Sequence, residues 1–201
     1  MRRSGKGVHR TPLLRTGGEP KVLLVLRENS NAVDLMLSRE VGVIIAELKA
    51  SGFAVVVASA SGRPIGRGVS RVEPDLNLAE VKVADYVGVL LPSMAVGLTA
   101  AVSVELIRIV RRAAALKIPL AAQHSSVVVL QRAGVLKKKR YAFQRRVFTV
   151  GEYAGPGVVR DGNIITSGTC PYLARETGRP DGTGTLTRLF IGAIREKKPI
   201  L

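Results

Sequence analysis

The sequence predicts an α/β fold in which a doubly wound, mostly parallel sheet carries helices on both faces. Four short apolar runs are continuous rather than alternating, which is typical of strands buried on both faces; they cover residues 22–26, 53–59, 86–92 and 118–122. Segments with helical spacing of apolar residues separate several of these runs, and strands that alternate with helices favour a parallel sheet. The 201 residues, 46% of them apolar, are enough for one domain with its own core.

The expected domain begins with VLLVL at residues 22–26 as the first buried strand. Residues 33–50 follow with apolar residues at helical spacing, and Gly52 is the expected stop of this helix. The second strand is FAVVVAS at residues 53–59. Residues 60–80 contain turn residues and short extended pieces, so no long element is expected there.

The middle of the chain repeats the strand–helix pattern. The third strand, residues 86–92, stops at its proline, and residues 99–116 form a long helix with one apolar face. The fourth strand, residues 118–122, runs into a tight turn. An apolar helix follows this turn and ends before Gly134, which is the expected cap.

The last third of the chain is expected to add strands and a closing helix. Residues 141–150 and 157–166 have the composition of strands, and residues 183–197 that of a helix. Asp161-Gly162 lies between VVR and NIIT and is a hairpin-turn signal. We therefore expect a late hairpin at the edge of the sheet.

Basic residues gather in two stretches of a chain whose net charge is +16 and whose pI is near 10.9. Residues 1–21 hold six basic residues and one acid, and residues 137–146 hold six and none. Residues 1–20 lack apolar periodicity, so we expect a flexible basic arm there and a single domain over 21–201. Clustered basic charge attracts nucleic acid, and a solvated face is an equally good interpretation. The candidate polyanion-binding residues are Arg2, Arg3, Lys6, Arg10, Arg15, Lys137, Lys138, Lys139, Arg140, Arg145 and Arg146.

Composition also disfavours several classes of protein. No apolar run reaches the ~18 residues of a membrane span, and residues 1–20 lack the apolar segment of a secretion signal, so we expect a cytoplasmic protein. The single Cys170 excludes an intrachain disulfide, and two histidines far apart argue against zinc. No GxGxxG or Walker loop follows a strand, so we expect no cofactor and no metal. Much arginine and a single cysteine would suit a thermophile.

The stretch IPLAAQHSSVVVL at residues 118–130 has the outline of a nucleophile elbow. Many α/β enzymes place a nucleophile on such a strand–turn–helix junction. This turn carries Gln123, His124, Ser125 and Ser126, and an amide cannot attack a carbonyl group. Ligands of doubly wound sheets bind beyond the carboxyl ends of the strands, so this turn is a candidate binding site even without a nucleophile.

Five stretches carry a family resemblance, in the order KVLLVL, GFAVVVASASGRPI, DYVGVLLP, KIPLAAQHSSVVVLQRAGVLKKKRYAF and VVRDGNIITSG. Together they resemble the ThiJ/PfpI family of the class I glutamine amidotransferase-like superfamily, over residues 21–195. The family includes a Parkinsonism-associated deglycase and archaeal intracellular proteases. The resemblance implies a flavodoxin-like fold, thiolate attack on a carbonyl as the usual chemistry, and a homo-oligomer.

Carried over residue by residue, the resemblance places Gln123 where the family has its cysteine, with His124 after it. The family glutamate falls near Asp34 if no gap intervenes, with Glu28 as a less favoured occupant. The Gly-Gly after the third strand becomes Ser93-Met94, and the segment after the late hairpin holds Thr169, Cys170 and Pro171. The resemblance thus gives the ligand-pocket candidates Asp34, Ser93, Met94, Gln123, His124 and Cys170.

Each elbow candidate has a structural interpretation beside the functional one. We favour Gln123 as a polar binding group over one that only satisfies the turn. His124 is more often a packed residue than an acid–base catalyst when no nucleophile lies beside it. Ser125 and Ser126 suit the N-cap of the next helix, and a nucleophilic serine is the alternative. Asp34 suits the start of a helix as well as it suits a pocket.

Cys170 follows the expected end of a strand, in a segment that the family resemblance brings close to the elbow. We prefer a small buried residue to a relocated nucleophile, because free cysteines are usually buried. The segment RETGRPDGTGT at residues 175–185 could cover the pocket or be a surface loop. Tyr141 and Phe143 alternate within the basic run, which favours burial of both rings over stacking with nucleobases.

The main functional hypothesis is a domain of this fold that lacks the elbow cysteine and binds a small ligand or a partner without thiol chemistry. The first alternative is a protein associated with RNA, DNA or the ribosome through the basic arm and residues 137–146. The second is a hydrolase or deglycase with a relocated nucleophile, either Cys170 or Ser125, or a water activated by Asp34 and His124.

Overall fold

The computed structural model describes residues 18–197, and seven strands form its main sheet. They are β1 (Lys21–Leu26), β2 (Ala54–Ser59), β5 (Leu76–Asn77), β6 (Gly88–Leu91), β7 (Leu120–Gln123), β10 (Val158–Asp161) and β11 (Ile164–Ser167). Their order is β10-β11-β7-β6-β1-β2-β5. All neighbours pair in parallel except β10 with β11, so the mostly parallel sheet is confirmed.

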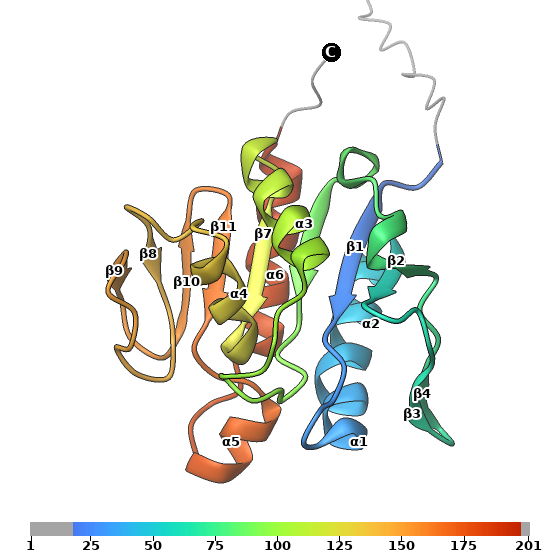
Figure 1. The fold of residues 1–201 in the computed structure, drawn as a ribbon, viewed down its shortest axis with the longest axis horizontal. Helices are drawn as coiled ribbons and strands as arrows, with labels where there is room; N and C mark the ends of the chain where they lie inside the picture. Colours follow the sequence, from blue (N-terminus) through green and yellow to red (C-terminus); the bar gives the residue numbers. More distant parts are fainter. Residues whose placement is uncertain (1–17, 198–201) are drawn as a thin grey trace, which may run out of the picture.

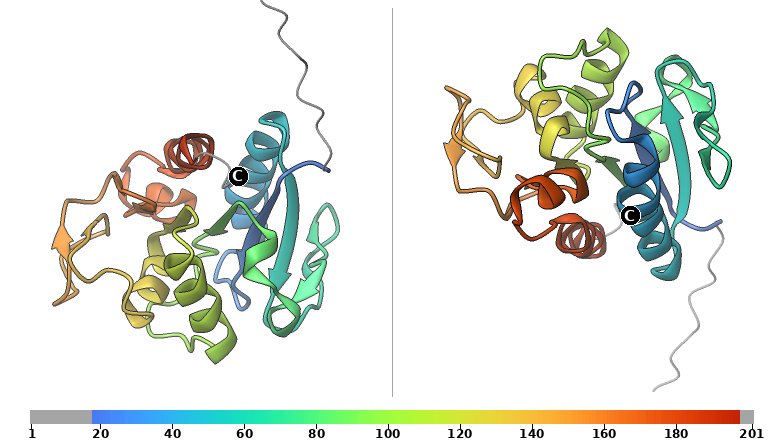
Figure 2. Two further views of the ribbon diagram at one scale, coloured as in Figure 1. Left: turned by 90° about the horizontal axis from the view of Figure 1, so that it is seen from above. Right: turned by 90° about the horizontal axis from the view of Figure 1, so that it is seen from below.

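Helices cover both faces of this sheet (Figures 1 and 2). One face packs on α3 (Val104–Ala115) and α4 (Val127–Arg132), as the first buried core cluster shows. The other packs on α1 (Val33–Met36), the π-helical turn η1 (Leu37–Val41), α2 (Gly42–Ala50) and α6 (Thr183–Glu196). The central strands β1, β6 and β7 are buried between these layers, which explains why their sequences are apolar without alternation.

The expected helix over residues 33–50 is continuous but contains a π-helical turn over Leu37–Val41. Such turns hold one extra residue and shift the register of the following side chains. A further helix, α5 (Pro171–Thr177), was not expected. Its signals were present in the sequence, because Pro171 opens the helix and Gly178 ends it with a φ of 69°.

The predicted strand over residues 141–150 is absent, since most of that segment is irregular in the described structure. Only the short β8 (Arg140–Tyr141) and β9 (Glu152–Tyr153) pair there, beside the main sheet. Tyr141 and Phe143 are fully buried against Phe148 instead of continuing a strand. Burial of both rings confirms that neither is free to stack on a nucleobase.

The remaining short elements lie at the edge near β2 and between strands. They are β3 (Ile65–Arg67), β4 (Ser70–Val72), and the 3-10 turns η2 (Leu78–Glu80), η3 (Val83–Asp85) and η4 (His124–Ser126). The hairpin between β10 and β11 turns at Gly162, whose φ is 63°, as the Asp-Gly signal predicted. No helix in the described part of the chain is long and apolar enough to cross a membrane.

Candidate functional site

A buried glutamate lies next to the turn that follows β6. The π-helical turn directs Glu40 inward, where it is fully buried and accepts hydrogen bonds from the backbone N–H groups of Ser93 (2.8 Å) and Met94 (2.9 Å). Burial raises the pKa of Glu40 to about 8, against the two hydrogen bonds that lower it. The carboxyl group is therefore mostly protonated at neutral pH.

The elbow after β7 has His124, not Gln123, at its apex. Gln123 is the last extended residue of the strand (φ −107°), whereas His124 has a φ of 39°. A left-handed backbone at a residue other than glycine is uncommon and marks the strained turn on which an elbow presents its side chain. The family resemblance placed Gln123 at the position of the family cysteine. The backbone angles instead place His124 at the apex of the elbow.

Two elbow hydroxyls tie β7 to the end of β6 rather than capping the next helix. Ser125 Oγ donates to the Ser93 carbonyl oxygen at 2.7 Å, and Ser126 Oγ donates to the Pro92 carbonyl oxygen at 2.6 Å. The helix that follows has no side-chain cap, so the predicted N-cap role is not observed. Because Ser125 is buried and engaged, it is a poor candidate for a free nucleophile.

Cys170 lies next to the elbow. It lies between β11 and α5, and its Sγ is 3.7 Å from His124 Nδ1. The residue is fully buried, as the sequence favoured, and it faces the site as the family resemblance implied. Burial, together with the nearby Glu40, raises the pKa of the Cys170 thiol to about 11.

His124 completes an uncharged cluster whose other members are Glu40, Ser93 and Cys170. Its ring stacks on Phe143 with centroids 5.7 Å apart, and its Nδ1 lies 3.5 Å from Ser93 Oγ. Burial lowers the pKa of His124. The buried Nε2 has no partner in the described structure. A neutral imidazole next to a protonated thiol is the opposite of a thiolate–imidazolium pair.

Gln123 points away from this cluster. Its Nε2 donates to the Thr169 carbonyl oxygen at 3.0 Å and to Thr183 Oγ1 at 2.9 Å, and lies 3.5 Å from Asp181 Oδ1. These contacts join β7 to the start of α6 and to the loop before it. Gln123 is fully buried, and its contacts with Asp181 and Thr183 fix part of the segment 175–185 that could have been a mobile lid.

The acid of the site is not where the sequence placed it. Asp34 is exposed near the start of α1, and Glu28 accepts hydrogen bonds from the backbone N–H and Oγ of Ser61. Sequence reasoning missed Glu40 because it assumed no gap before this helix. A signal existed: Glu40 falls four residues after Met36 and four before Ile44, and an acid on the apolar stripe of a helix is unusual.

A cavity of about 460 Å³ opens beside the elbow, at the carboxyl end of β1. Its apolar lining comes from β1, α3 and the loop before α3, and Arg27 lines it as well. The Arg27 guanidinium donates to the Ser125 carbonyl oxygen at 3.1 Å, so the cavity and the elbow share a residue. This cavity lies within the size range of small-molecule sites.

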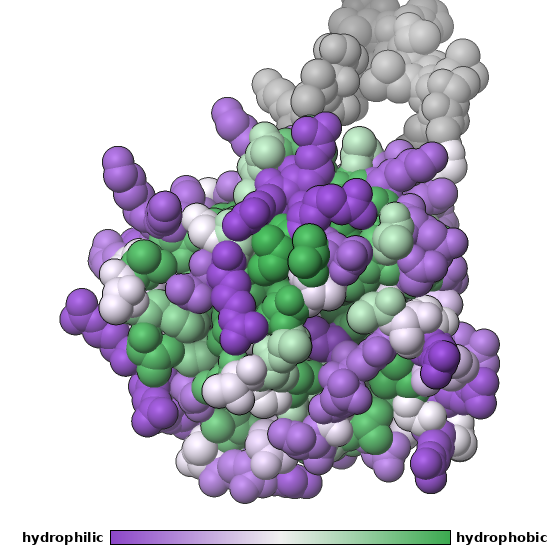
Figure 3. Space-filling model, viewed as in Figure 1, coloured by the Kyte–Doolittle hydropathy of each residue, from purple (hydrophilic) through white to green (hydrophobic). Residues whose placement is uncertain are grey.

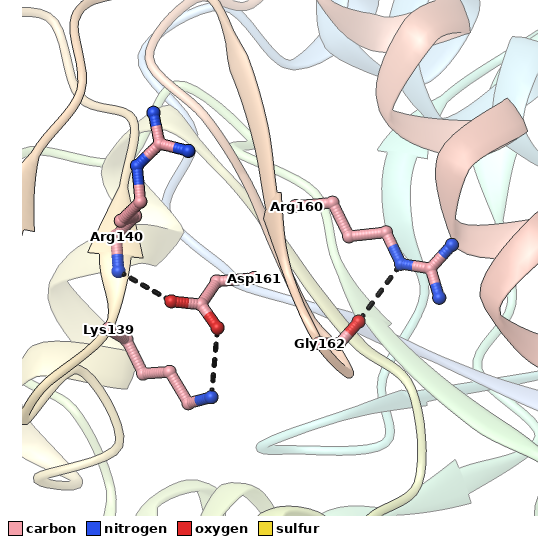
Figure 4. A network of polar contacts seen from close by, with 5 residues as sticks. All are labelled: Lys139, Arg140, Arg160, Asp161 and Gly162. Carbon is pink, nitrogen blue, oxygen red and sulfur yellow. Dashed lines mark hydrogen bonds and ion pairs between the residues drawn. The ribbon is translucent and has the colours of Figure 1, made fainter.

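The basic run after α4 is exposed at most positions. Lys137, Lys138, Arg145 and Arg146 are exposed, whereas Lys139 is held by Asp161 at 2.9 Å. Figure 4 shows the Asp161 carboxylate between the Lys139 amine and the Arg140 backbone nitrogen. The basic residues of the expected arm over 1–20, Arg2, Arg3, Lys6, Arg10 and Arg15, lie outside the described residues.

Comparison with solved structures agrees with the fold. The structure resembles a ThiJ/PfpI domain protein from Brachyspira murdochii (TM-score 0.62, 16% identity, 90% of this chain and 99% of that one). It also resembles Drosophila melanogaster DJ-1beta (TM-score 0.62, 21% identity, 89% and 95%). A third similar structure is a putative transcriptional regulator from Vibrio parahaemolyticus (TM-score 0.61, 16% identity, 89% and 96%).

The family model of the DJ-1/PfpI family matches residues 21–176, which is most of the chain. No curated protein matches the sequence significantly. The matched range includes the buried Glu40, the elbow with His124 and the segment with Cys170, so the family assignment covers the whole cluster. The chain belongs to the DJ-1/PfpI family.

Proposed function

We propose that this chain is a DJ-1/PfpI domain that binds a small molecule at the carboxyl edge of its sheet and carries out no thiolate chemistry. The cavity beside the elbow supports the proposed binding of a small molecule. The observation that carries the second part is the state of Cys170, the only cysteine of the chain: its sulfur is fully buried and its pKa is raised to about 11.

The electrostatics of the cluster support this proposal. With a thiol pKa of about 11, only on the order of one thiol in ten thousand is ionised at neutral pH. The neighbouring His124 has a lowered pKa, so no imidazolium stabilises a thiolate, and ionisation of Glu40 raises the pKa of the thiol further. The site therefore has a sulfur and an imidazole in contact without an activated nucleophile.

We expect no turnover of methylglyoxal-modified amines, model peptides or simple esters by the full chain. The physical reason is the absence of a reactive thiolate or of a free serine hydroxyl at the elbow. The measurement is product formation over hours, with a thiol-dependent deglycase assayed in parallel to show that the substrates are competent.

Cys170→Ser and Ser125→Ala serve as the matched variants of this assay. Turnover above buffer that disappears in Cys170→Ser would establish a relocated thiol nucleophile and overturn the proposal. Turnover that survives Cys170→Ser but is lost in Ser125→Ala would instead establish serine chemistry.

A second candidate function is association with nucleic acid. It is favoured by the exposure of Lys137, Lys138, Arg145 and Arg146 without a carboxylate within 4 Å in residues 18–197. Figure 3 shows hydrophilic side chains projecting from the edge of the molecule where β8 and β9 lie. Long-range attraction of phosphates needs only such a surface, with no built pocket. A ribosomal partner would be recognised through the same charges.

If this surface binds RNA, replacing Lys137, Lys138, Arg145 and Arg146 together by glutamine should weaken binding and flatten its salt dependence. Loss of about four phosphate contacts should reduce the slope of log K against log salt by about 3. Binding is measured by fluorescence anisotropy with mixed-sequence RNA at several salt concentrations. The matched control neutralises four other exposed basic residues, Lys49, Lys82, Arg108 and Arg112. Equal effects of the two quadruple variants would remove this candidate function.

A further inference from the structure

A buried arginine without a carboxylate partner lines the cavity at the end of β1. Arg27 is 6% exposed, and the one hydrogen bond that its guanidinium makes within residues 18–197 goes to the Ser125 carbonyl oxygen. No carboxylate of the described chain lies within 4 Å of the guanidinium. Buried charges are usually paired, so an unpaired arginine that faces a cavity needs an explanation.

The remaining charged groups near Arg27 do not neutralise it. Arg132 is close enough to lower the pKa of Arg27, which burial and this second cation bring to about 10. Arg132 itself donates to the carbonyl oxygen of Ala100, a residue that lines the cavity. Glu28 is the acid in the lining, and its carboxylate is engaged by Ser61 and faces the charge of Arg63. The positive charge in the cavity is thus left for a ligand.

The N-terminus of α3 opens into the same cavity. Ser103, the N-cap, lines it and accepts a hydrogen bond from the backbone N–H of Leu106, and Leu106 also lines it. The first N–H groups of a helix of this length favour a negative charge. Arg27 and the N-cap of α3 therefore line one cavity, and the acid in the first turn of α3, Glu105, is not among the lining residues.

The rest of the lining determines the size and polarity of the ligand. The cavity volume is about 460 Å³, and apolar side chains make up much of the wall, among them Leu26, Leu78, Val96 and Val102. Asn29 and Asn31 supply amide groups on the loop after β1. Such a wall suits a molecule with an apolar body and a single anionic end.

We propose that this cavity binds a small organic carboxylate whose anionic end pairs with the Arg27 guanidinium and whose apolar body lies against β1 and α3. A guanidinium presents parallel N–H donors that match a carboxylate bidentately. This inference deepens the proposed binding function by naming its ligand class and its binding residue. It does not depend on the state of Cys170.

The test is isothermal titration of the full chain with 4-phenylbutyrate, with its neutral amide and with inorganic phosphate. The carboxylate should bind at least tenfold more tightly than the amide, because only the carboxylate pairs with Arg27. Inorganic phosphate should bind more weakly than 4-phenylbutyrate, because it lacks the apolar body. Tight binding of phosphate alone would identify a site for an inorganic or phosphorylated ligand and contradict the proposal.

Two variants separate the role of the charge from that of the space. Arg27→Met keeps an unbranched apolar side chain, and should lower carboxylate affinity at least tenfold while leaving amide affinity within twofold. Gly97→Phe keeps Arg27 and fills the mouth, since nothing lies within 4 Å of a Cβ at Gly97, and should abolish binding of both compounds. Circular dichroism checks that each variant folds.

Equal affinities of carboxylate and amide in the wild-type chain would overturn the proposal, as would carboxylate binding that survives both variants. Neither result bears on the turnover assay, which examines thiol and serine chemistry. A failure of the carboxylate site can therefore be distinguished from a failure of the non-catalytic assignment.

Discussion

Glu40→Gln should lower the free energy of unfolding by about 3 kcal/mol at pH 5, because it breaks one of two buried hydrogen bonds and brings two donors together. The wild-type carboxyl oxygens accept from both Ser93 and Met94. A glutamine offers one oxygen, and its NH₂ group would face the second backbone N–H. Urea denaturation measures the change, and the exposed Glu19→Gln is the matched control.

The same variant should change how stability depends on pH. The pKa of Glu40 is raised to about 8 in the folded protein, from its ordinary value of 4.5. The folded state therefore binds more protons between these values, and wild-type stability should be fully present below pH 4.5 and fall as the pH rises through 8. Glu40→Gln lacks this titration, so the difference between the two proteins should shrink from pH 5 to pH 8. A difference that grows with pH would contradict a protonated, buried Glu40.

Gly168→Ala should destabilise the protein by about 3 kcal/mol, near the upper end of the range for overpacking. A Cβ at this position would lie 2.6 Å from the Phe143 carbonyl carbon and 2.6 Å from the Pro156 carbonyl oxygen. Both are backbone atoms, which cannot rotate away as a side chain can. Because Gly168 joins β11 to Cys170, relief of the clash should also displace the sulfur from His124.

Gly192→Ala in α6 is the matched control, since no atom lies within 4 Å of its Cβ. Alanine is the better helix former by about 1 kcal/mol, so this variant should be neutral or stabilising. Thermal unfolding of the two variants beside the wild type measures both effects. A Gly168→Ala protein as stable as Gly192→Ala would show that the passage of the chain between Phe143 and Pro156 is looser than the structure has it.

The fold could be predicted from the sequence because its strands are buried on both faces. VLLVL and LAAQ keep this signal without tertiary information, as does the helix with Ile109 and Ala113 on one face. The segment over 141–150 could not be predicted, since its aromatic residues are buried by a small cluster rather than by strand pairing. Local alternation cannot distinguish these two ways of burying a ring.

The site could be predicted only in outline. Strand order brings the elbow, the Ser93 turn and Cys170 to one edge of the sheet. The sequence motifs identified these three segments as parts of the site. The acid was missed because the family pattern was aligned without a gap before this helix, and the apex was misplaced by one residue because a single φ angle decides it. Arg27 was missed because its burial and its hydrogen bond to the Ser125 carbonyl oxygen arise from tertiary packing. A homo-oligomeric assembly stays a prediction.

The central claim is that the sulfur at this elbow is a protonated, buried thiol. Because Cys170 is the only cysteine, protein labelled with ¹³C at the cysteine Cβ gives one signal whose chemical shift reports ionisation. The predicted titration has its midpoint near the raised pKa of about 11, with no thiolate between pH 6 and pH 9 for as long as the protein stays folded. A midpoint below pH 8 would contradict the account and restore Cys170 as an activated nucleophile.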